Sequence, residues 1–107
     1  MNYPTREQAL ELLHEYTKTD SLRKHAIAVE AVMKAFAANH NEDPHKFGLV
    51  GLLHDFDYEI HPNAPDHPLK GSEILRARQM PEDIVYAIQC HADYLGIERK
   101  TLMDRAI

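Results

Sequence analysis

The sequence predicts an all-α protein, a compact bundle of five or six helices in a single domain over residues 1–107. Apolar residues recur at spacings of three and four along most of the chain, which is the period of an amphipathic helix. No segment alternates apolar and polar residues as a half-buried strand does. A chain of 107 residues can form one hydrophobic core but not two.

The first two helices are predicted from their capping residues and apolar spacing. Thr5, followed by Gln8 three residues later, forms a capping-box pattern that begins a helix ending at about Thr17. Asp20 or Ser21 is expected to cap a second helix over residues 22–40. The predicted inner line of that helix consists of Leu22, His25, Val29, Val32 and Phe36.

The third helix, over residues 44–56, is expected to be the central one. Asp43 and Pro44 form a cap and first turn. The helix is apolar nearly all round, which is typical of an element surrounded by others. It nevertheless contains two adjacent groups that are costly to bury, His54 and Asp55.

The rest of the chain is predicted to hold a loop and two or three helices. The proline-rich segment 57–68 indicates a loop. A fourth helix is expected over residues 67–79, a fifth over 82–92, and a sixth from about Glu98. Because the sixth has no C-cap before Ile107, we expect the natural protein to continue and this chain to lack its final helices.

Composition excludes several classes of function. With 44% hydrophobic and 27% charged residues, the chain has a globular balance, and no apolar run reaches the 18 residues of a membrane span. A net charge of −5 without a basic cluster argues against a nucleic-acid polymer or an anionic membrane as the main partner. The single cysteine, Cys90, cannot form an internal disulfide, so a cytoplasmic location is expected.

Polar side chains on core-facing helix lines suggest a metal site. Three of the eight histidines are placed in this way: His25, His54 and His91. Asp55 lies on the face of Gly48 and Gly51, where missing side chains let another helix or an ion come close. Imidazole nitrogens with a carboxylate suit manganese, iron, zinc or nickel better than calcium, which prefers oxygen ligands throughout.

The order of these residues resembles the HD-domain superfamily of metal-dependent phosphohydrolases. The resemblance rests on His25, the His54-Asp55 doublet, and the stretches "DHPLKGSEIL" and "IVYAIQCHADY" in this order. It covers the chain from about Leu22 to its end. The implied fold is the HD-domain helical bundle, and the implied activity is hydrolysis of a phosphate bond by a metal-activated water.

The resemblance also implies a set of site residues. His25, His54 and Asp55 are the expected metal ligands, and Asp55 and His54 are the expected catalytic residues. In some subfamilies further histidines hold a second ion with the doublet's aspartate as a bridge, and His67 and His91 match those positions. One or two divalent ions are therefore implied. At a helix N-terminus, the ring of His67 is also expected to stay neutral.

Two features of the family pattern remain open in the sequence. The closing aspartate of the family is either Asp104 or a residue beyond Ile107. Lys70 and His61 are candidates to hold a substrate phosphate, with an ordinary surface role as the alternative for each. The expected partner is a small phosphorylated molecule, and the sequence leaves its identity and the oligomeric state open.

Other functions compete with hydrolysis. The main alternative is a non-catalytic HD-like module that binds a ligand or a protein and carries a vestigial metal site. A metal-dependent oxygenase is a third possibility. For the histidines individually, the alternative is a hydrogen bond within the fold and no metal.

Overall fold

The computed structural model describes residues 3–61, 63, 66–92 and 95–107, apart from the side chains of Asp66 and Pro68. Part of the predicted loop and the end of the second motif therefore lie outside the described residues. Within them the chain forms six α-helices: α1 (Arg6–Tyr16), α2 (Asp20–Asn39), α3 (Pro44–Leu53), α4 (Asp66–Ala77), α5 (Glu82–Cys90) and α6 (Leu102–Ala106). The all-α prediction is confirmed. None of these helices is both long and apolar enough to cross a bilayer.

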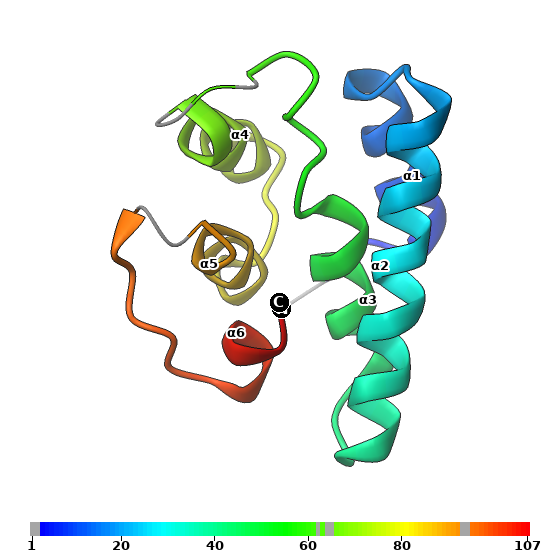
Figure 1. The fold of residues 1–107 in the computed structure, drawn as a ribbon, viewed down its shortest axis with the longest axis vertical. Coiled ribbons are helices and arrows are strands. Elements are labelled where there is room, and N and C mark those ends of the chain that lie inside the picture. The colour runs from blue at the N-terminus through cyan, green and yellow to red at the C-terminus, as the bar shows by residue number, and fades with distance from the viewer. Residues whose placement is uncertain (1–2, 62, 64–65, 93–94) are drawn as a thin grey trace.

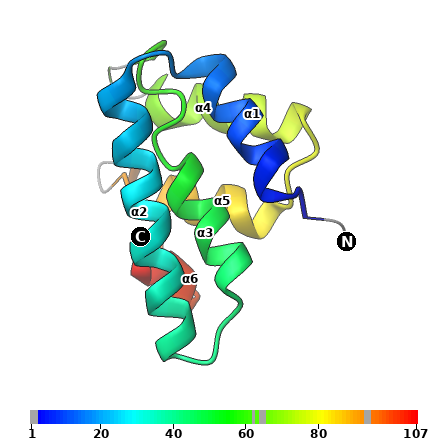
Figure 2. The same ribbon diagram turned by 90° about the vertical axis from the view of Figure 1, so that its right-hand side faces the viewer.

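Helix α3 lies at the centre, as its sequence predicts. Every residue from Phe47 to Leu53 is buried. Helices α1 and α2 pack on one side of α3, and α5, flanked by α4 and α6, lies on the other (Figure 1). Figure 2 shows α2 and α3 side by side. A single core shared by these helices follows from this arrangement.

Gly51 allows α2 and α3 to pack closely. A Cβ at this position would lie 2.8 Å from the carbonyl oxygen of Val29 and 3.0 Å from Cα of Glu30. Both atoms belong to the backbone of α2 and cannot move aside. The group that comes close to Gly51, which the sequence predicts to be either a helix or an ion, is therefore helix α2.

The inner face of α2 differs from the predicted one. Its buried residues are Ala26, Glu30, Met33 and Ala37. Val32 is 67% exposed and His25 is exposed as well, so the predicted line was wrong for both. The reason is that Glu30 lies in the buried face, where Arg6 forms two hydrogen bonds with its carboxylate at 2.7 and 2.9 Å. A sequence pattern scores this glutamate as a surface residue.

Several helix ends also differ from the predicted ones. Helix α3 ends at Leu53 and a series of turns follows, so the doublet is not inside the helix. Helix α2 begins at Asp20 with Thr19 as N-cap, and α4 begins at Asp66 instead of after a loop to residue 68. Helix α6 begins at Leu102 and not near Glu98, because Thr101 and Asp104 form a capping box there.

The turns after α3 are fastened to the junction of α1 and α2. The hydroxyl of Thr17 donates to the carbonyl of Phe56 at 2.9 Å. The carboxylate of Glu59 accepts hydrogen bonds from the backbone N–H groups of Lys18 and Thr19, at 2.9 and 2.8 Å. These bonds hold residues 54–60 against the start of α2, the helix that carries His25.

Candidate metal centre

Four histidines and one aspartate converge at the C-terminal end of α3. His25 comes from α2, His54 is the residue that follows α3, and Asp55 is the next residue. His67 lies in the first turn of α4, and His91 directly follows α5. The structure thus brings together all five residues that the sequence analysis names as ligands.

The carboxylate of Asp55 divides these side chains into two groups. Oδ2 lies 3.3 Å from Nε2 of His54 and 3.9 Å from Nε2 of His25. Oδ1 lies 3.0 Å from Nε2 of His67 and 3.1 Å from Nε2 of His91. In each group the candidate ligand atoms lie within 4.8 Å of one another. Asp55 belongs to both groups, and each takes a different oxygen.

The local sequence explains why the doublet lies where it does. Leu53 and Phe56, on either side of it, are both fully buried and fix the chain in the core. His54 keeps helical backbone angles, so the chain turns once more after α3 before it leaves. As a result, the two polar residues face the space between α2, α4 and α5.

Three of the imidazoles are oriented by a hydrogen bond at Nδ1, the ring nitrogen that does not face Asp55. Nδ1 of His54 lies 2.7 Å from the carbonyl oxygen of Gly51, and Nδ1 of His91 contacts the carbonyl oxygen of Ile88. A carbonyl only accepts, so each Nδ1 carries the hydrogen. Nδ1 of His67 lies 2.6 Å from Oδ1 of Asp57. The three Nε2 atoms therefore face Asp55.

With all of these rings neutral and no cation present, this arrangement is electrostatically unfavourable. A neutral ring with its hydrogen on Nδ1 presents the Nε2 lone pair to a carboxylate, and the two repel each other. Nε2 of His67 also lies only 3.3 Å from Nε2 of His91, so at most one hydrogen fits between the two rings. A divalent ion removes both conflicts, because it binds lone pairs and carboxylate oxygens at once. The donor set therefore fits a metal.

The pKa values reflect the same convergence. Burial alone would raise the pKa of Asp55, but hydrogen bonds with the surrounding imidazoles outweigh it and hold the pKa far below its usual range. Burial lowers the pKa of His67, yet the bonds to Asp55 and Asp57 prevail and raise it to about 9. The pKa of His54 is raised in the same way by Asp55. The expectation that the helix N-terminus keeps His67 neutral is thus wrong for the chain without an ion.

Exposure changes across the cluster. The side chains of His54 and His67 are almost entirely buried, whereas that of His25 is 53% exposed. Asp55 lies between these extremes with 29% of its side chain exposed. The centre is consequently open to solvent on the His25 side, where a water or a ligand can reach it.

The remaining predicted residues do not join the cluster among the described residues. Lys70 is exposed and pairs with Glu73 at 3.7 Å, and His61 makes no side-chain hydrogen bond or ion pair with the cluster. The carboxylate of Asp104 accepts hydrogen bonds from the N–H groups of Lys100 and Thr101 and so caps α6. Asp104 belongs to neither of the two groups of candidate ligands among the described residues.

Sequence reasoning missed Asp57 and Glu59. Asp57 is buried and hydrogen-bonds His67, and Glu59 fastens the turn to α2. The only signal for Asp57 was its place two residues after Asp55, with a buried phenylalanine between them. Nothing in the sequence marks Glu59, because its partners, two backbone N–H groups and the hydroxyl of Thr19, lie 40 and 41 residues earlier in the chain.

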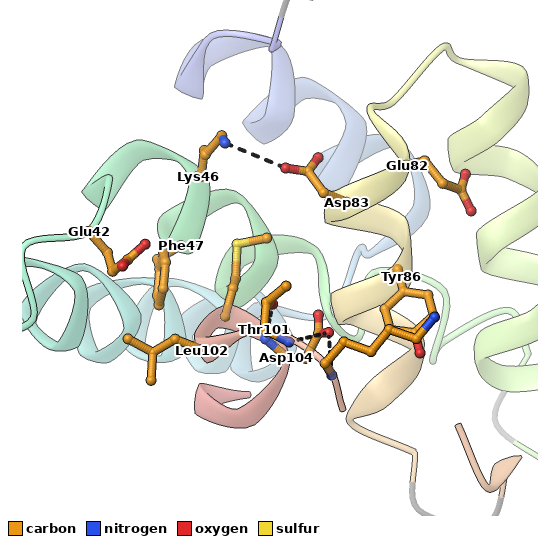
Figure 3. A pocket seen from close by; sticks show the side chains of 11 residues that line it. Glu42, Lys46, Phe47, Glu82, Asp83, Tyr86, Thr101, Leu102 and Asp104 are labelled. Carbon is orange, nitrogen blue, oxygen red and sulfur yellow. Dashed lines mark hydrogen bonds and ion pairs between the residues drawn. The ribbon is translucent and has the colours of Figure 1, made fainter. Parts of the chain in front are cut away.

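A cavity of about 530 Å³ lies elsewhere, between α3, α5 and α6 (Figure 3). Phe47, Tyr86 and Leu102 are among its walls, and Lys46 at its rim pairs with Asp83 at 3.5 Å. None of the five clustered residues lines it. We do not assign the functional site to this cavity, since the candidate donors for an ion lie together at the other end of α3.

Comparison with known proteins agrees with this geometry. The sequence model of the HD domain matches residues 22–106, which is most of the chain and includes all five clustered residues. The chain belongs to the HD domain family. HD domains bind divalent metals and are typically metal-dependent phosphohydrolases. The HD-domain fold expected from the sequence is therefore confirmed.

Among curated proteins the chain is similar to Ribonuclease Y of Lawsonia intracellularis (strain PHE/MN1-00). The two are 29% identical over 87 residues, which is 80% of this chain and 17% of that protein. The HD domain described here thus spans about a sixth of the length of that relative. No solved structure matches the chain.

Proposed function

We propose that this HD domain is a metal-dependent phosphohydrolase that cleaves a phosphate bond in a small phosphorylated molecule. The observation that carries the proposal is the arrangement of imidazole nitrogens around the two oxygens of Asp55. Membership of the HD domain family supports the same activity. As ligands we propose His25, His54, Asp55, His67 and His91.

Two ions fit this donor set. One would be held by His25, His54 and Oδ2 of Asp55, and the other by His67, His91 and Oδ1. Nitrogen and oxygen donors favour manganese, iron, zinc or nickel. No thiolate is present in either group, so these are not the closed sites of structural zinc.

A bound divalent ion supplies an activated water and polarises a phosphoryl oxygen. The chain's own residues supply orientation. The carbonyls of Gly51 and Ile88 hold the hydrogens of His54 and His91 on Nδ1. The exposed side near His25 is where a phosphate can enter, and Lys70 and His61 are the proposed phosphate contacts.

A small molecule is a better substrate than a nucleic-acid polymer on grounds of charge. The chain carries a net charge of −5, which repels a polyanion. The similarity to Ribonuclease Y covers too little of that protein to carry its substrate over. A cytoplasmic location remains a prediction from the single cysteine.

Turnover of phosphate esters tests the proposal. The purified protein is supplied with manganese, iron, zinc or nickel and assayed with p-nitrophenyl phosphate and with nucleoside monophosphates. We expect turnover that a chelator abolishes and a metal restores. His54→Gln should abolish it, whereas His14→Gln, which replaces an exposed histidine of α1, should leave it unchanged.

Two outcomes would contradict the proposal. One is a metal-loaded protein that turns over none of these esters. The other is turnover that survives both the chelator and His54→Gln. A folded protein that holds no metal and is indifferent to Asp55→Ala would favour the alternative of a non-catalytic binding module.

A further inference from the structure

Asp57 is a charged residue in an almost completely buried position. Only 1% of it is exposed, although it is a carboxylate. Oδ1 accepts a hydrogen bond from Nδ1 of His67 at 2.6 Å. Oδ2 is buried and has no hydrogen-bond partner among the described residues. A buried carboxylate with one unpaired oxygen destabilises the fold, so a purely structural role accounts poorly for it.

Gly71 makes room for this carboxylate. A Cβ at position 71 would lie 2.5 Å from Cγ and 2.8 Å from Cβ of Asp57 and would also collide with Oδ2. Real side chains do not approach so closely. Helix α4 can therefore pack over Asp57 only because residue 71 has no side chain.

Asp57 contacts two residues, His67 and Gly71, on the same face of α4. His67 and Gly71 are four residues apart in α4, so they lie above one another on one side of the helix. The carboxylate packs against Gly71 and reaches the ring of His67. Any side chain at position 71 would push the carboxylate out of line with Nδ1.

We propose that Asp57, seated against Gly71, positions His67 for metal binding, an inference that rests on the proposed metal centre. The hydrogen bond fixes the hydrogen on Nδ1 and directs Nε2 toward Asp55 and His91. A carboxylate behind a ligating histidine also increases the basicity of the ring. Asp57 is a positioning residue, because it acts on the ion only through His67.

The two groups of ligands, which form the two halves of the centre, differ in what orients their histidines. His54 is oriented by a backbone carbonyl, and His25 belongs to the same half. Loss of Asp57 should therefore weaken only the ion held by His67 and His91. The affinity for that ion is expected to fall about 10- to 100-fold, and the affinity for the other should stay within about twofold.

The test compares Asp57→Ala, Asp57→Asn and Gly71→Ala with the unchanged chain. Gly71→Ala is the sharpest variant, because it keeps every donor atom and displaces only the carboxylate. Asp20→Asn, at an exposed acid of α2, is the matched control. Zinc binding is measured by calorimetry, and the hydrogen on each imidazole nitrogen is located by ¹H–¹⁵N NMR of the zinc-loaded protein.

We expect one of two zinc-binding steps to weaken in Asp57→Ala and Gly71→Ala, with the NMR signature of His67 changed and that of His54 preserved. Asp57→Asn keeps the shape and should lose less affinity. If the other two variants do not fold, Asp57→Asn alone decides the matter. The control should bind as the unchanged chain does.

Failure of this inference is distinct from failure of the proposed function. If the unchanged chain binds zinc and all three variants bind it equally, with the His67 signature intact, Asp57 has no positioning role and the metal centre stands. A loss of both binding steps at once would also overturn the inference, because it assigns Asp57 to one half. If the unchanged chain binds no zinc, the metal centre itself is wrong.

Discussion

The charge state of His67 gives a prediction that couples stability, pH and metal binding. Burial lowers the pKa of this ring, but Asp55 and Asp57 prevail and raise it from 6.5 to about 9. In the chain without an ion, folding is therefore favoured by the proton that His67 binds. The stabilisation is fully present below pH 6.5 and is lost as the pH rises through 9.

The expected magnitude follows from the size of the shift. A change from 6.5 to about 9 corresponds to roughly 3 kcal/mol of unfolding free energy. Near pH 7.5–8 the folded chain holds about 0.9 more protons on His67 than the unfolded chain, so stability falls by about 1.2 kcal/mol per pH unit. Since a metal ligand must be deprotonated, zinc binding at pH 8 should release about 0.9 protons from this ring.

Urea unfolding between pH 6 and 9.5, with chelator present, measures the first effect. His67→Gln is the matched variant and should reduce the slope by about one proton's contribution. A smaller slope remains, because the pKa of His54 is also raised. Calorimetry of zinc binding in buffers of different ionisation enthalpy counts the released protons. A stability that is flat across this range, or zinc binding without proton release, would refute the reasoning.

Three further predictions concern how α2 packs against its neighbours. Arg6→Met should cost about 3 kcal/mol in urea unfolding, because it removes both hydrogen bonds to the buried carboxylate of Glu30 and leaves it with Lys34, 3.5 Å away. A cost near zero would contradict the assigned ion pair. Burial raises the pKa of Glu30 but bonds from Arg6 outweigh it and lower the pKa. The stability that this pair contributes is thus present above about pH 4.3 and lost as the pH falls through the lower folded value, and Arg6→Met should weaken that acid dependence. Gly51→Ala should cost about 1–3 kcal/mol, since its methyl group meets backbone atoms of α2. Val32→Ala, at a position 67% exposed, should change stability by less than about 0.5 kcal/mol, and a core-sized loss would restore the predicted inner line.

Much of the fold was predictable because helical periodicity and capping are local properties. The capping box of Thr5 and Gln8 begins α1 as expected, and the continuous apolar run of α3 correctly predicts a central helix. The inner face of α2 was not predictable in this way. Glu30 is buried only because Arg6, which lies 24 residues earlier, reaches its carboxylate.

The candidate site, too, was predictable only where it depends on residue types and their order. The ligands were named from their types and order, and the structure brings them together. The role of Asp57 depends on a residue without a side chain, Gly71, in a helix that only the fold brings near. The pKa of His67 was misjudged because the helix N-terminus was considered and the two carboxylates beside the ring were not.

Elemental analysis of the purified chain tests the central claim most directly. Asp55→Ala is the comparison, and Asp20→Ala, an exposed acid of α2, is the control. The account predicts one or two transition-metal ions per chain in the unchanged protein and in the control, and none in Asp55→Ala, which removes the carboxylate common to both groups. Metal content that is equal in Asp55→Ala and the unchanged chain, or absent from both after growth and purification with added metal, would contradict it.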